Sequence, residues 1–131
     1  FFYLRRGGIM AQIISLPTFS DERGSLTVIE KFLPFEIKRI YYIYNAKEKR
    51  GGHRHLKTTQ ALVCPKGSCE IFINNGNSKQ TVLLDSPDKC LVLSPEDWHS
   101  MDKFTPDCVL LVLASEFFDK ADYIEEEYPR D

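Results

Sequence analysis

Two of the three histidines in the chain, His53 and His55, lie two residues apart in a segment rich in cationic side chains. In an extended strand alternate side chains share a face, so both imidazoles would point the same way. An imidazole with its ordinary pKa of about 6.5 takes up and releases protons near neutral pH. The pair therefore predicts proton abstraction next to a carbonyl, with cations or phenols stabilising the oxyanion. The sequence offers Arg23, Arg50, Tyr41, Tyr42 and Tyr44 for that stabilising role.

The histidines lie within residues 47–57, where an anionic ligand is expected. The cations of this segment are Lys47, Lys49, Arg50, Arg54 and Lys57, against Glu48, so its local net charge is +4 in a chain of net −2. A concentrated cationic patch favours an anion. The competing interpretation of the charges is a solvated loop without a ligand. Likewise, the histidines could be structural residues and the tyrosines could serve only in packing. Gly51 and Gly52 permit either a close approach to a ligand or a plain turn.

A bound metal ion is an alternative use of the histidines. His53, His55 and a folded-in His99 would supply three imidazoles to a catalytic zinc ion, and an iron-dependent oxygenase needs two histidines and a carboxylate. Thr59 and Gln60 stand after His55 where a barrel's metal-binding strand would offer that carboxylate. We therefore expect no metal at the histidines.

The other side chains that could react or bind a ligand are expected to pack in the core, or their role is undecided. The four cysteines, Cys64, Cys69, Cys90 and Cys108, are expected to be buried thiols, because zinc-binding pairs are spaced more closely than the first two. Trp98, where a loop re-enters a strand, either stacks on a base or sugar or fills the core. The sequence contains no nucleophile-elbow motif, so nucleophilic catalysis by serine is not expected.

Length and charge limit the class of protein. The 131 residues fit one domain, taken here as residues 10–131, and the net charge of −2 argues against a nucleic-acid partner. No apolar run approaches the roughly 18 residues that cross a bilayer, so no membrane partner is expected. Residues 1–9 are treated as an extension. Because Arg5 and Arg6 interrupt their apolar stretch, no secretory signal is expected, and we predict a cytoplasmic protein.

The elements that must position these residues are short β-strands. Apolar segments rich in Val, Ile, Tyr and Phe alternate with turn residues, which predicts an all-β sandwich or barrel of antiparallel strands. Residues 75–76, Asn-Gly, are the clearest hairpin signal. Only residues 117–128 look helical, with Asp119 as a candidate N-cap. The expected strands cover residues 13–16, 25–30, 37–44, 52–55, 60–64, 68–74, 80–84, 90–93, 98–104 and 108–114.

Several motifs, taken in order, resemble the sugar 3,4-ketoisomerases, which are small cupins of the WxcM-like type. The likeness extends from about Ile14 to Tyr123. Together the ordered motifs are highly specific, whereas His-x-His alone is not. The motifs are residues 21–26 (DERGSL), 35–42 (FEIKRIYY), 50–55 (RGGHRH), 60–64 (QALVC), 84–87 (LDSP) and 98–99 (WH).

This resemblance implies a double-stranded β-helix, or jelly roll, in a homodimer. The short C-terminal helix is expected from the residue pattern and not from the resemblance. The resemblance also implies action on dTDP-4-keto-6-deoxy-D-glucose without metal or redox cofactor. Members move the carbonyl from C4 to C3 on the way to 3-amino or 3-acylamino deoxysugars of surface glycans such as the O-antigen of lipopolysaccharide. The diphosphate of such a substrate would account for the cationic segment.

Carried onto this chain, the resemblance implies that His55 removes the C3 proton and that His53 is a supporting acid or orienting group. Arg23 and His99 match positions that face the hexose, and this combination resembles members that form dTDP-3-keto-6-deoxy-D-galactose. Thr59 departs from the Glu of close relatives, which affects one secondary contact. The other expected substrate-binding residues are Arg50, Tyr42, Trp98 and Gln60.

Other functions stay open at this point. A neighbouring cupin activity, 3,5-epimerisation of the same sugar, is the alternative enzyme, but the chain is shorter than typical epimerases and is expected to lack their histidine–aspartate dyad. A cupin that binds a sugar nucleotide without catalysis is the alternative from another class. A metal-dependent oxygenase comes third.

Overall fold

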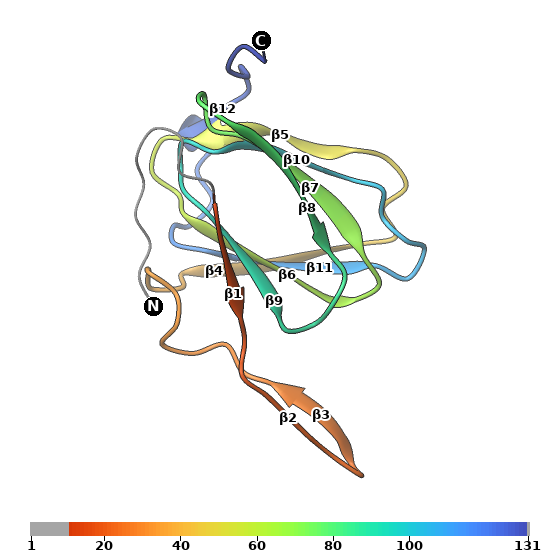
Figure 1. Cartoon of the computed structure of the whole chain (residues 1–131). Coiled ribbons are helices and arrows are strands. Elements are labelled where there is room, and N and C mark those ends of the chain that lie inside the picture. The colour runs from red at the N-terminus through yellow and green to blue at the C-terminus, as the bar shows by residue number, and fades with distance from the viewer. Residues whose placement is uncertain (1–10, 131) are drawn as a thin grey trace.

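The computed structural model describes residues 11–130, so the expected extension at residues 1–9 lies outside the described residues. Two five-stranded antiparallel sheets face each other and enclose the core, and a separate two-stranded hairpin extends from them (Figure 1). This arrangement confirms the expected all-β jelly roll. None of the helical segments among residues 11–130 is long and apolar enough to cross a membrane.

One sheet has the order β1 (Gln12–Ser15), β9 (Lys89–Leu93), β6 (Gln60–Lys66), β11 (Val109–Ala114) and β4 (Arg39–Tyr44). The other has the order β12 (Tyr123–Ile124), β5 (Arg50–His55), β10 (Trp98–Asp102), β7 (Cys69–Asn74) and β8 (Lys79–Leu84). The hairpin consists of β2 (Thr18–Asp21) and β3 (Gly24–Thr27). From β4 onward the chain crosses between the two sheets at each step except the β7–β8 hairpin, which stays within one sheet.

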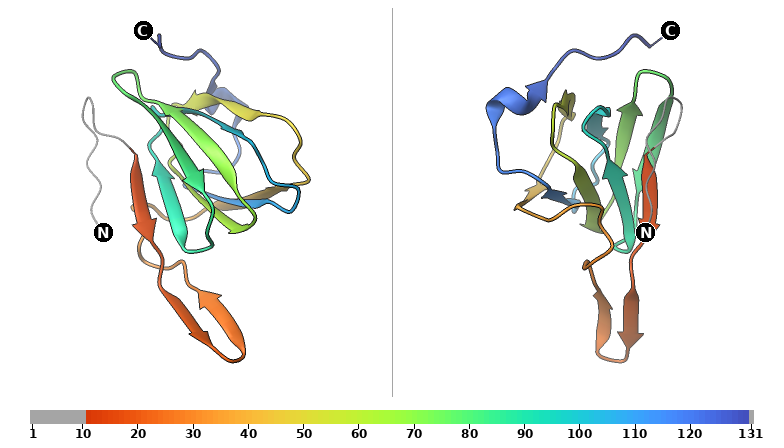
Figure 2. Two further views of the ribbon diagram at one scale, coloured as in Figure 1. Left: turned by 45° about the vertical axis from the view of Figure 1, so that its right-hand side comes forward. Right: turned by 90° about the vertical axis from the view of Figure 1, so that its left-hand side faces the viewer.

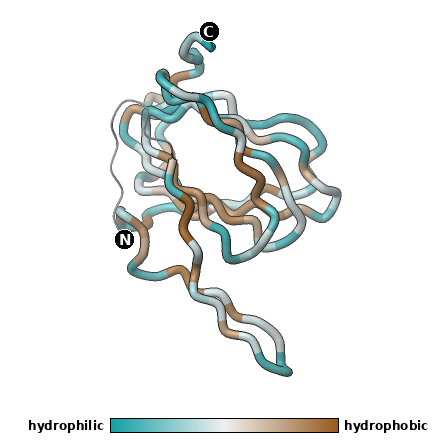
Figure 3. Tube along the Cα trace, in the orientation of Figure 1, coloured by the Kyte–Doolittle hydropathy of each residue, from teal (hydrophilic) through white to brown (hydrophobic). Residues whose placement is uncertain are grey.

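The core lies between the two sheets, because alternate residues of each strand face inward. Leu62 on β6 and Ile71 and Ile73 on β7 are fully buried there, together with Leu110 on β11. Each such side chain contributes roughly 1.5–3 kcal/mol through burial of apolar surface. Figure 3 shows the apolar segments along the strands that form the walls. This core holds the barrel rigid around the residues described below.

The sequence located the strands well but overestimated the C-terminal helix. Each of the ten expected strands overlaps an observed one, whereas β2 and β12 were not expected. In place of a helix over residues 117–128, the structure has a three-residue 3₁₀ helix, Lys120–Asp122, with Asp119 as its N-cap. Strand β12 follows at once and pairs with β5. Backbone pairing with an existing sheet edge therefore overrides the helical pattern in this segment.

The hairpin β2–β3 projects away from the barrel (Figures 1 and 2). Phe19 and Leu26 lie opposite each other on its two strands, and both are more than half exposed. An isolated two-stranded hairpin is marginally stable in water without a partner to cover its apolar side. Within one chain the apolar side of the hairpin is therefore left uncovered.

Candidate active site

The strand that carries the paired histidines, β5, contains two glycines in a left-handed conformation. Gly51 and Gly52 have φ angles of +83° and +81°. A Cβ atom on Gly51 would lie 3.2 Å from both the carbonyl oxygen of His99 and the Cα atom of Ser100. The glycines therefore let β5 approach β10 closely, at an irregularity in the pairing that puts His53 opposite His99.

This pairing gathers the three histidines. The ring centroid of His53 lies 5.1 Å from that of His55 and 5.1 Å from that of His99. Tyr123 on β12 contacts the first two rings, with centroid distances of 4.6 and 4.7 Å. His55 and His99 are buried, whereas His53 is partly exposed. The three rings therefore form one cluster, which we call the histidine cluster, with His53 as its most accessible member.

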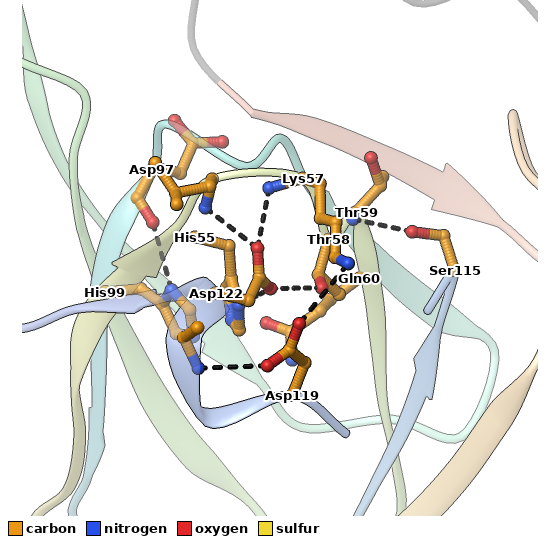
Figure 4. A network of polar contacts seen from close by, with 12 residues as sticks. His55, Lys57, Thr58, Thr59, Gln60, Asp97, His99, Ser115, Asp119 and Asp122 are labelled. Carbon is orange, nitrogen blue, oxygen red and sulfur yellow. Dashed lines mark hydrogen bonds and ion pairs between the residues drawn. The ribbon is translucent and has the colours of Figure 1, made fainter. Parts of the chain in front are cut away.

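Asp122 orients the ring of His55. Its Oδ2 atom lies 2.7 Å from Nδ1 of His55 and also accepts a hydrogen bond from the Thr58 hydroxyl (Figure 4). The backbone N–H groups of Leu56 and Lys57 donate to its Oδ1 atom, at 3.0 and 2.7 Å. Although burial opposes ionisation, these hydrogen bonds hold the pKa of Asp122 below its ordinary value. An ionised Asp122 accepts the Nδ1 proton of His55, which leaves the lone pair at Nε2.

The dyad of His55 and Asp122 corrects the expectation that the chain lacks such a pair. The two residues are 67 positions apart in the sequence, so no local motif reports their contact. Nε2 of His55 is buried and has no hydrogen-bond partner among residues 11–130. His55 therefore has the unprotonated ring nitrogen that a general base requires.

All three histidines are held in the neutral form. Burial lowers the pKa of each below its ordinary value of 6.5, and for His53 burial and the neighbouring His55 together lower it to about 4. The hydrogen bond to Asp122 acts in the opposite direction at His55, but burial is the larger effect. At neutral pH the cluster therefore accepts protons and does not supply fixed positive charge.

The depressed pKa values predict how stability depends on pH. The unfolded chain binds protons at its histidines below about pH 6.5, whereas the folded chain does so only nearer pH 4 in the case of His53. The free energy of unfolding is therefore expected to fall as the pH is lowered from 7 to 5. Urea unfolding at several pH values measures this, and the decrease should be smaller in His53→Asn. A free energy of unfolding that stays constant or rises over this interval would contradict the neutral cluster.

Gln60, another expected substrate-binding residue, is buried inside the barrel. Its amide donates a hydrogen bond of 3.2 Å to the hydroxyl of Tyr41, and its Oε1 atom is buried with no partner among residues 11–130. Burial raises the pKa of Tyr41, while the charges of Arg39 and Arg50 act in the opposite direction. Arg50 is therefore close enough to Tyr41 to affect the ionisation of its hydroxyl, although Arg50 is exposed.

Two expected substrate-binding residues, Tyr42 and Arg23, lie on the outside of the molecule, whereas Trp98 directly precedes His99 on β10. Tyr42 is 62% exposed on the outer side of β4, because inward and outward positions alternate and Tyr41 takes the inward one. Trp98 is buried; its indole N–H donates to the carbonyl of Glu125, and its ring packs on Phe72. Arg23 lies in the exposed turn of the β2–β3 hairpin, paired with Asp21. The contacts of Tyr42, Trp98 and Arg23 with a substrate therefore stay predictions.

The cationic segment does not form one continuous face. Lys57 pairs with Asp119 at 3.4 Å, and the guanidinium of Arg54 lies 4.7 Å from the ring centroid of Tyr128. Arg39, which was not among the expected site residues, lies on the inner side of β4, with its guanidinium 4.4 Å from the ring centroid of Tyr41. Its charge also lowers the pKa of His55. One cation of the inner site therefore comes from outside the segment that the sequence singled out.

Comparison with known proteins identifies the family. The family model described as FdtA, WxcM-like, C-terminal matches residues 10–129. The chain belongs to the WxcM-like FdtA family. This result confirms the resemblance seen in the sequence motifs.

Relatives of this WxcM-like chain include characterised isomerases. The TDP-4-oxo-6-deoxy-α-D-glucose-3,4-oxoisomerase of Aneurinibacillus thermoaerophilus is 46% identical over 119 residues, or 88% of this chain and 86% of the relative. Two solved structures from Campylobacter jejuni superpose closely. The TDP-quinovose 3,4-ketoisomerase is 40% identical, with a TM-score of 0.85 and coverage of 88% and 92% of the two chains. The TDP-fucose-3,4-ketoisomerase is 35% identical, with a TM-score of 0.84 and coverage of 90% of each chain.

The arrangement of this WxcM-like site suits proton transfer better than metal binding by histidine. Among residues 11–130, the potential ligand atoms that converge as a group of three belong to cysteines at another place in the fold, and not to the histidines. Nδ1 of His55 faces Asp122 and Nδ1 of His99 lies 3.1 Å from the carbonyl oxygen of Asp97, so each of these rings keeps Nε2 for another partner. Because the three rings do not converge as the ligands of one ion would, the alternative of a trihistidine zinc site gains no support from these distances.

Proposed function

We propose that this chain is a 3,4-ketoisomerase that converts dTDP-4-keto-6-deoxy-D-glucose into the corresponding 3-keto sugar. The observation that carries the proposal is the buried His55–Asp122 dyad, whose free Nε2 atom belongs to a cluster of neutral imidazoles. The relative with 46% identity is a TDP-4-oxo-6-deoxy-α-D-glucose-3,4-oxoisomerase, which supports the same substrate. The reaction oxidises C3 and reduces C4 of one sugar, so it needs no external oxidant or reductant.

In the proposed reaction His55 acts as the base at C3. Its Nε2 atom takes the C3 proton, the C–H electron pair forms the C3–C4 double bond, and the C4 carbonyl oxygen becomes the oxygen of an enediolate. The O3 proton then moves to O4, the C3 carbonyl forms, and the double-bond electrons take up at C4 the proton held on the His55 imidazolium, directly or by way of His53, so that no proton is gained or lost overall. Asp122 stabilises the imidazolium formed in the first step, and partly exposed His53 supplies a proton or orients the sugar.

Cations near the inner site oppose the negative charge of the intermediate. Arg39 lies over Tyr41, whose hydroxyl accepts the amide of Gln60, and Arg50 is near enough to affect Tyr41. We propose that Arg39 and Arg50 stabilise the enediolate or the diphosphate, and that Gln60 offers its free Oε1 atom to a sugar hydroxyl.

We also propose that the protein is a homodimer whose β2–β3 hairpin packs on the partner chain. The hairpin extends from the barrel and exposes Phe19 and Leu26, and a surface cavity of about 360 Å³ lies along it. A second copy would cover this apolar side and carry the exposed Arg23 toward a neighbouring site. Arg23 would then face the hexose of the partner's substrate, as its sequence motif implies, although it lies apart from the histidines of its own chain.

The hairpin proposal predicts a change of assembly. The double variant Phe19→Glu, Leu26→Glu should be monomeric, because four new charges per dimer would be buried in the contact. Sedimentation at several concentrations measures the assembly, and turnover should fall with the fraction of monomer. Leu83→Glu changes another exposed leucine, on β8, and is the matched control. A double variant that remains dimeric would exclude the hairpin as the contact.

The configuration of the product at C4 is proposed from Arg23 and His99. These two residues favour dTDP-3-keto-6-deoxy-D-galactose, which has the C4 configuration of fucose. The relatives at 35% and 40% identity are named for fucose and quinovose, which differ in configuration at C4, so overall sequence identity does not decide the product. Incubation with dTDP-4-keto-6-deoxy-D-glucose and proton coupling constants of the product provide the test. Formation of the 3-keto galacto sugar is expected. Absence of any 3-keto product would contradict the proposed function, and the gluco product would contradict the roles of Arg23 and His99.

The alternatives differ in which proton exchanges. A histidine–aspartate dyad serves 3,5-epimerisation as well as isomerisation, so its presence does not separate the two, whereas exchange at C5 would favour the epimerase. Tight binding of dTDP without turnover would favour a non-catalytic cupin. We further infer that the enzyme acts in the cytoplasm, where its product would supply amino deoxysugars for a surface glycan such as O-antigen.

A further inference from the structure

Three of the four cysteines meet at the end of the barrel away from the histidines. Cys64 lies on β6, Cys69 begins β7, and Cys108 precedes β11. Gln60 marks the histidine end of β6, and at about 3.3 Å per residue Cys64 lies roughly 13 Å farther along that strand. The thiol cluster is therefore a feature separate from the proposed active site, and the sequence spacing alone gave no reason to expect it.

The three sulfur atoms are close together and buried. Sγ of Cys64 lies 3.4 Å from Sγ of Cys108, and all three sulfur atoms lie within 4.8 Å of one another. None of the three residues is more than 3% exposed. Four-coordinate zinc with Zn–S bonds of about 2.3 Å separates its sulfur ligands by about 3.8 Å. Small rotations of the side chains therefore bring the three sulfur atoms to the spacing of a metal–thiolate site.

The turn between β6 and β7 fixes this geometry. Gly67 adopts a φ of +70°, and a Cβ atom there would lie only 2.7 Å from both the Cα atom of Cys108 and Oδ1 of Asp107. The turn therefore packs directly against the segment that carries the third thiol. The backbone N–H of Cys108 donates to the carbonyl of Thr105, which holds that segment in place. The ligands are thus preorganised by three separate parts of the chain.

An approach to the cluster exists from the surface. A cavity of about 340 Å³ is lined by Cys108 and Asp107, among other residues. Three thiolates leave the fourth position of a tetrahedral ion open. Water or the carboxylate of Asp107 would be the ligand at that position. Convergent soft donors, suitable distances and an entry path are the features by which a metal site is recognised.

We propose that Cys64, Cys69 and Cys108 form a binding site for a thiophilic d¹⁰ cation, with Zn²⁺ as its first occupant. Binding releases protons from the thiols and joins β6, β7 and the segment before β11. Because the ion binds only the folded chain, it stabilises the fold by RT ln(1 + c/Kd), where c is the concentration of the free ion. The site is structural and independent of the proposed isomerase reaction.

The test is titration of the full-length reduced protein with Co²⁺, followed by displacement with Zn²⁺. We expect one Co²⁺ per chain, with the thiolate charge-transfer absorption and visible bands of a tetrahedral ion, and complete loss of both on addition of Zn²⁺. Cys108→Ser should weaken binding at least tenfold, whereas Cys90→Ser, which alters a buried thiol outside the cluster, should leave it unchanged.

Titration of the native protein with Co²⁺ is sufficient to overturn the proposal, even if a cysteine variant does not fold. Absence of a thiolate band at saturating Co²⁺ would contradict it. A bound ion whose spectrum persists in Cys108→Ser but disappears in His53→Asn would belong to the histidines, and would contradict it equally. Loss of two thiols to a disulfide between Cys64 and Cys108 in air-equilibrated, metal-supplemented buffer would show that the cluster is oxidised in preference to binding the ion.

Discussion

His55→Asn is expected to lower turnover of dTDP-4-keto-6-deoxy-D-glucose by at least about a hundredfold, since a positioned general base contributes roughly 10²- to 10⁴-fold. The asparagine amide has no nitrogen lone pair that can accept a proton from C3. Nδ1 of His55 contacts Asp122 inside the barrel, so the amide also retains a group able to reach that carboxylate and the fold should persist. Steady-state rates measure the effect.

Two controls accompany His55→Asn. Circular dichroism and binding of dTDP should be close to those of the parent protein, which separates loss of the base from loss of the fold or of the nucleotide contacts. His53→Asn, which alters the more exposed ring of the pair, should retain exchange at C3 if His55 is the base. Near-full turnover in His55→Asn, with turnover lost only in His53→Asn, would assign the base to His53 instead.

Asp122→Asn is expected to have an effect of similar size, roughly 10²-fold or more. The asparagine oxygen still accepts the backbone N–H groups of Leu56 and Lys57, but its NH₂ group now faces His55 and Thr58. Nδ1 of His55 must then accept a hydrogen bond, which moves the ring proton to Nε2 and removes the lone pair that attacks C3. Turnover should fall with little change in KM.

A tautomer measurement distinguishes this role from a purely structural one. Nitrogen NMR should show His55 protonated at Nδ1 in the parent protein and at Nε2 in Asp122→Asn. Asp119→Asn is the matched control, because Asp119 is a nearby carboxylate that caps the 3₁₀ helix and pairs with Lys57 at the surface. Unchanged tautomer and turnover in Asp122→Asn would contradict the proposed positioning of the base.

The fold was accessible from the sequence because its information is local. Alternation within short segments, as in β4 where Tyr41 faces inward and Tyr42 outward, is a period-two signal that single strands carry. The same reasoning placed His53 and His55 on one face. The residues around Asp119 look helical locally, but pairing of Tyr123 with His55 makes the following residues a strand. That pairing depends on a sheet edge that local sequence does not report.

The site itself was only partly accessible, because its contacts join distant residues. Asp122 meets His55 across 67 positions, and the three thiols meet from β6, β7 and the segment before β11. Neither contact follows a short spacing rule. Arg23 shows the converse case, since its motif implies a sugar contact while its place in the hairpin separates it from the histidines of the same chain. The proposed dimer would reconcile the two by placing Arg23 at the site of the other copy.

The central claim is that the histidine cluster moves a proton between adjacent carbons of a nucleotide-linked keto sugar. Incubation of the protein with dTDP-4-keto-6-deoxy-D-glucose in D₂O, followed by proton NMR, tests it most directly. We predict deuterium at C3 of recovered substrate or C4 of product, formation of the 3-keto sugar, and no deuterium at C5. Exchange confined to C5, or a sugar recovered without any deuterium, would contradict the claim.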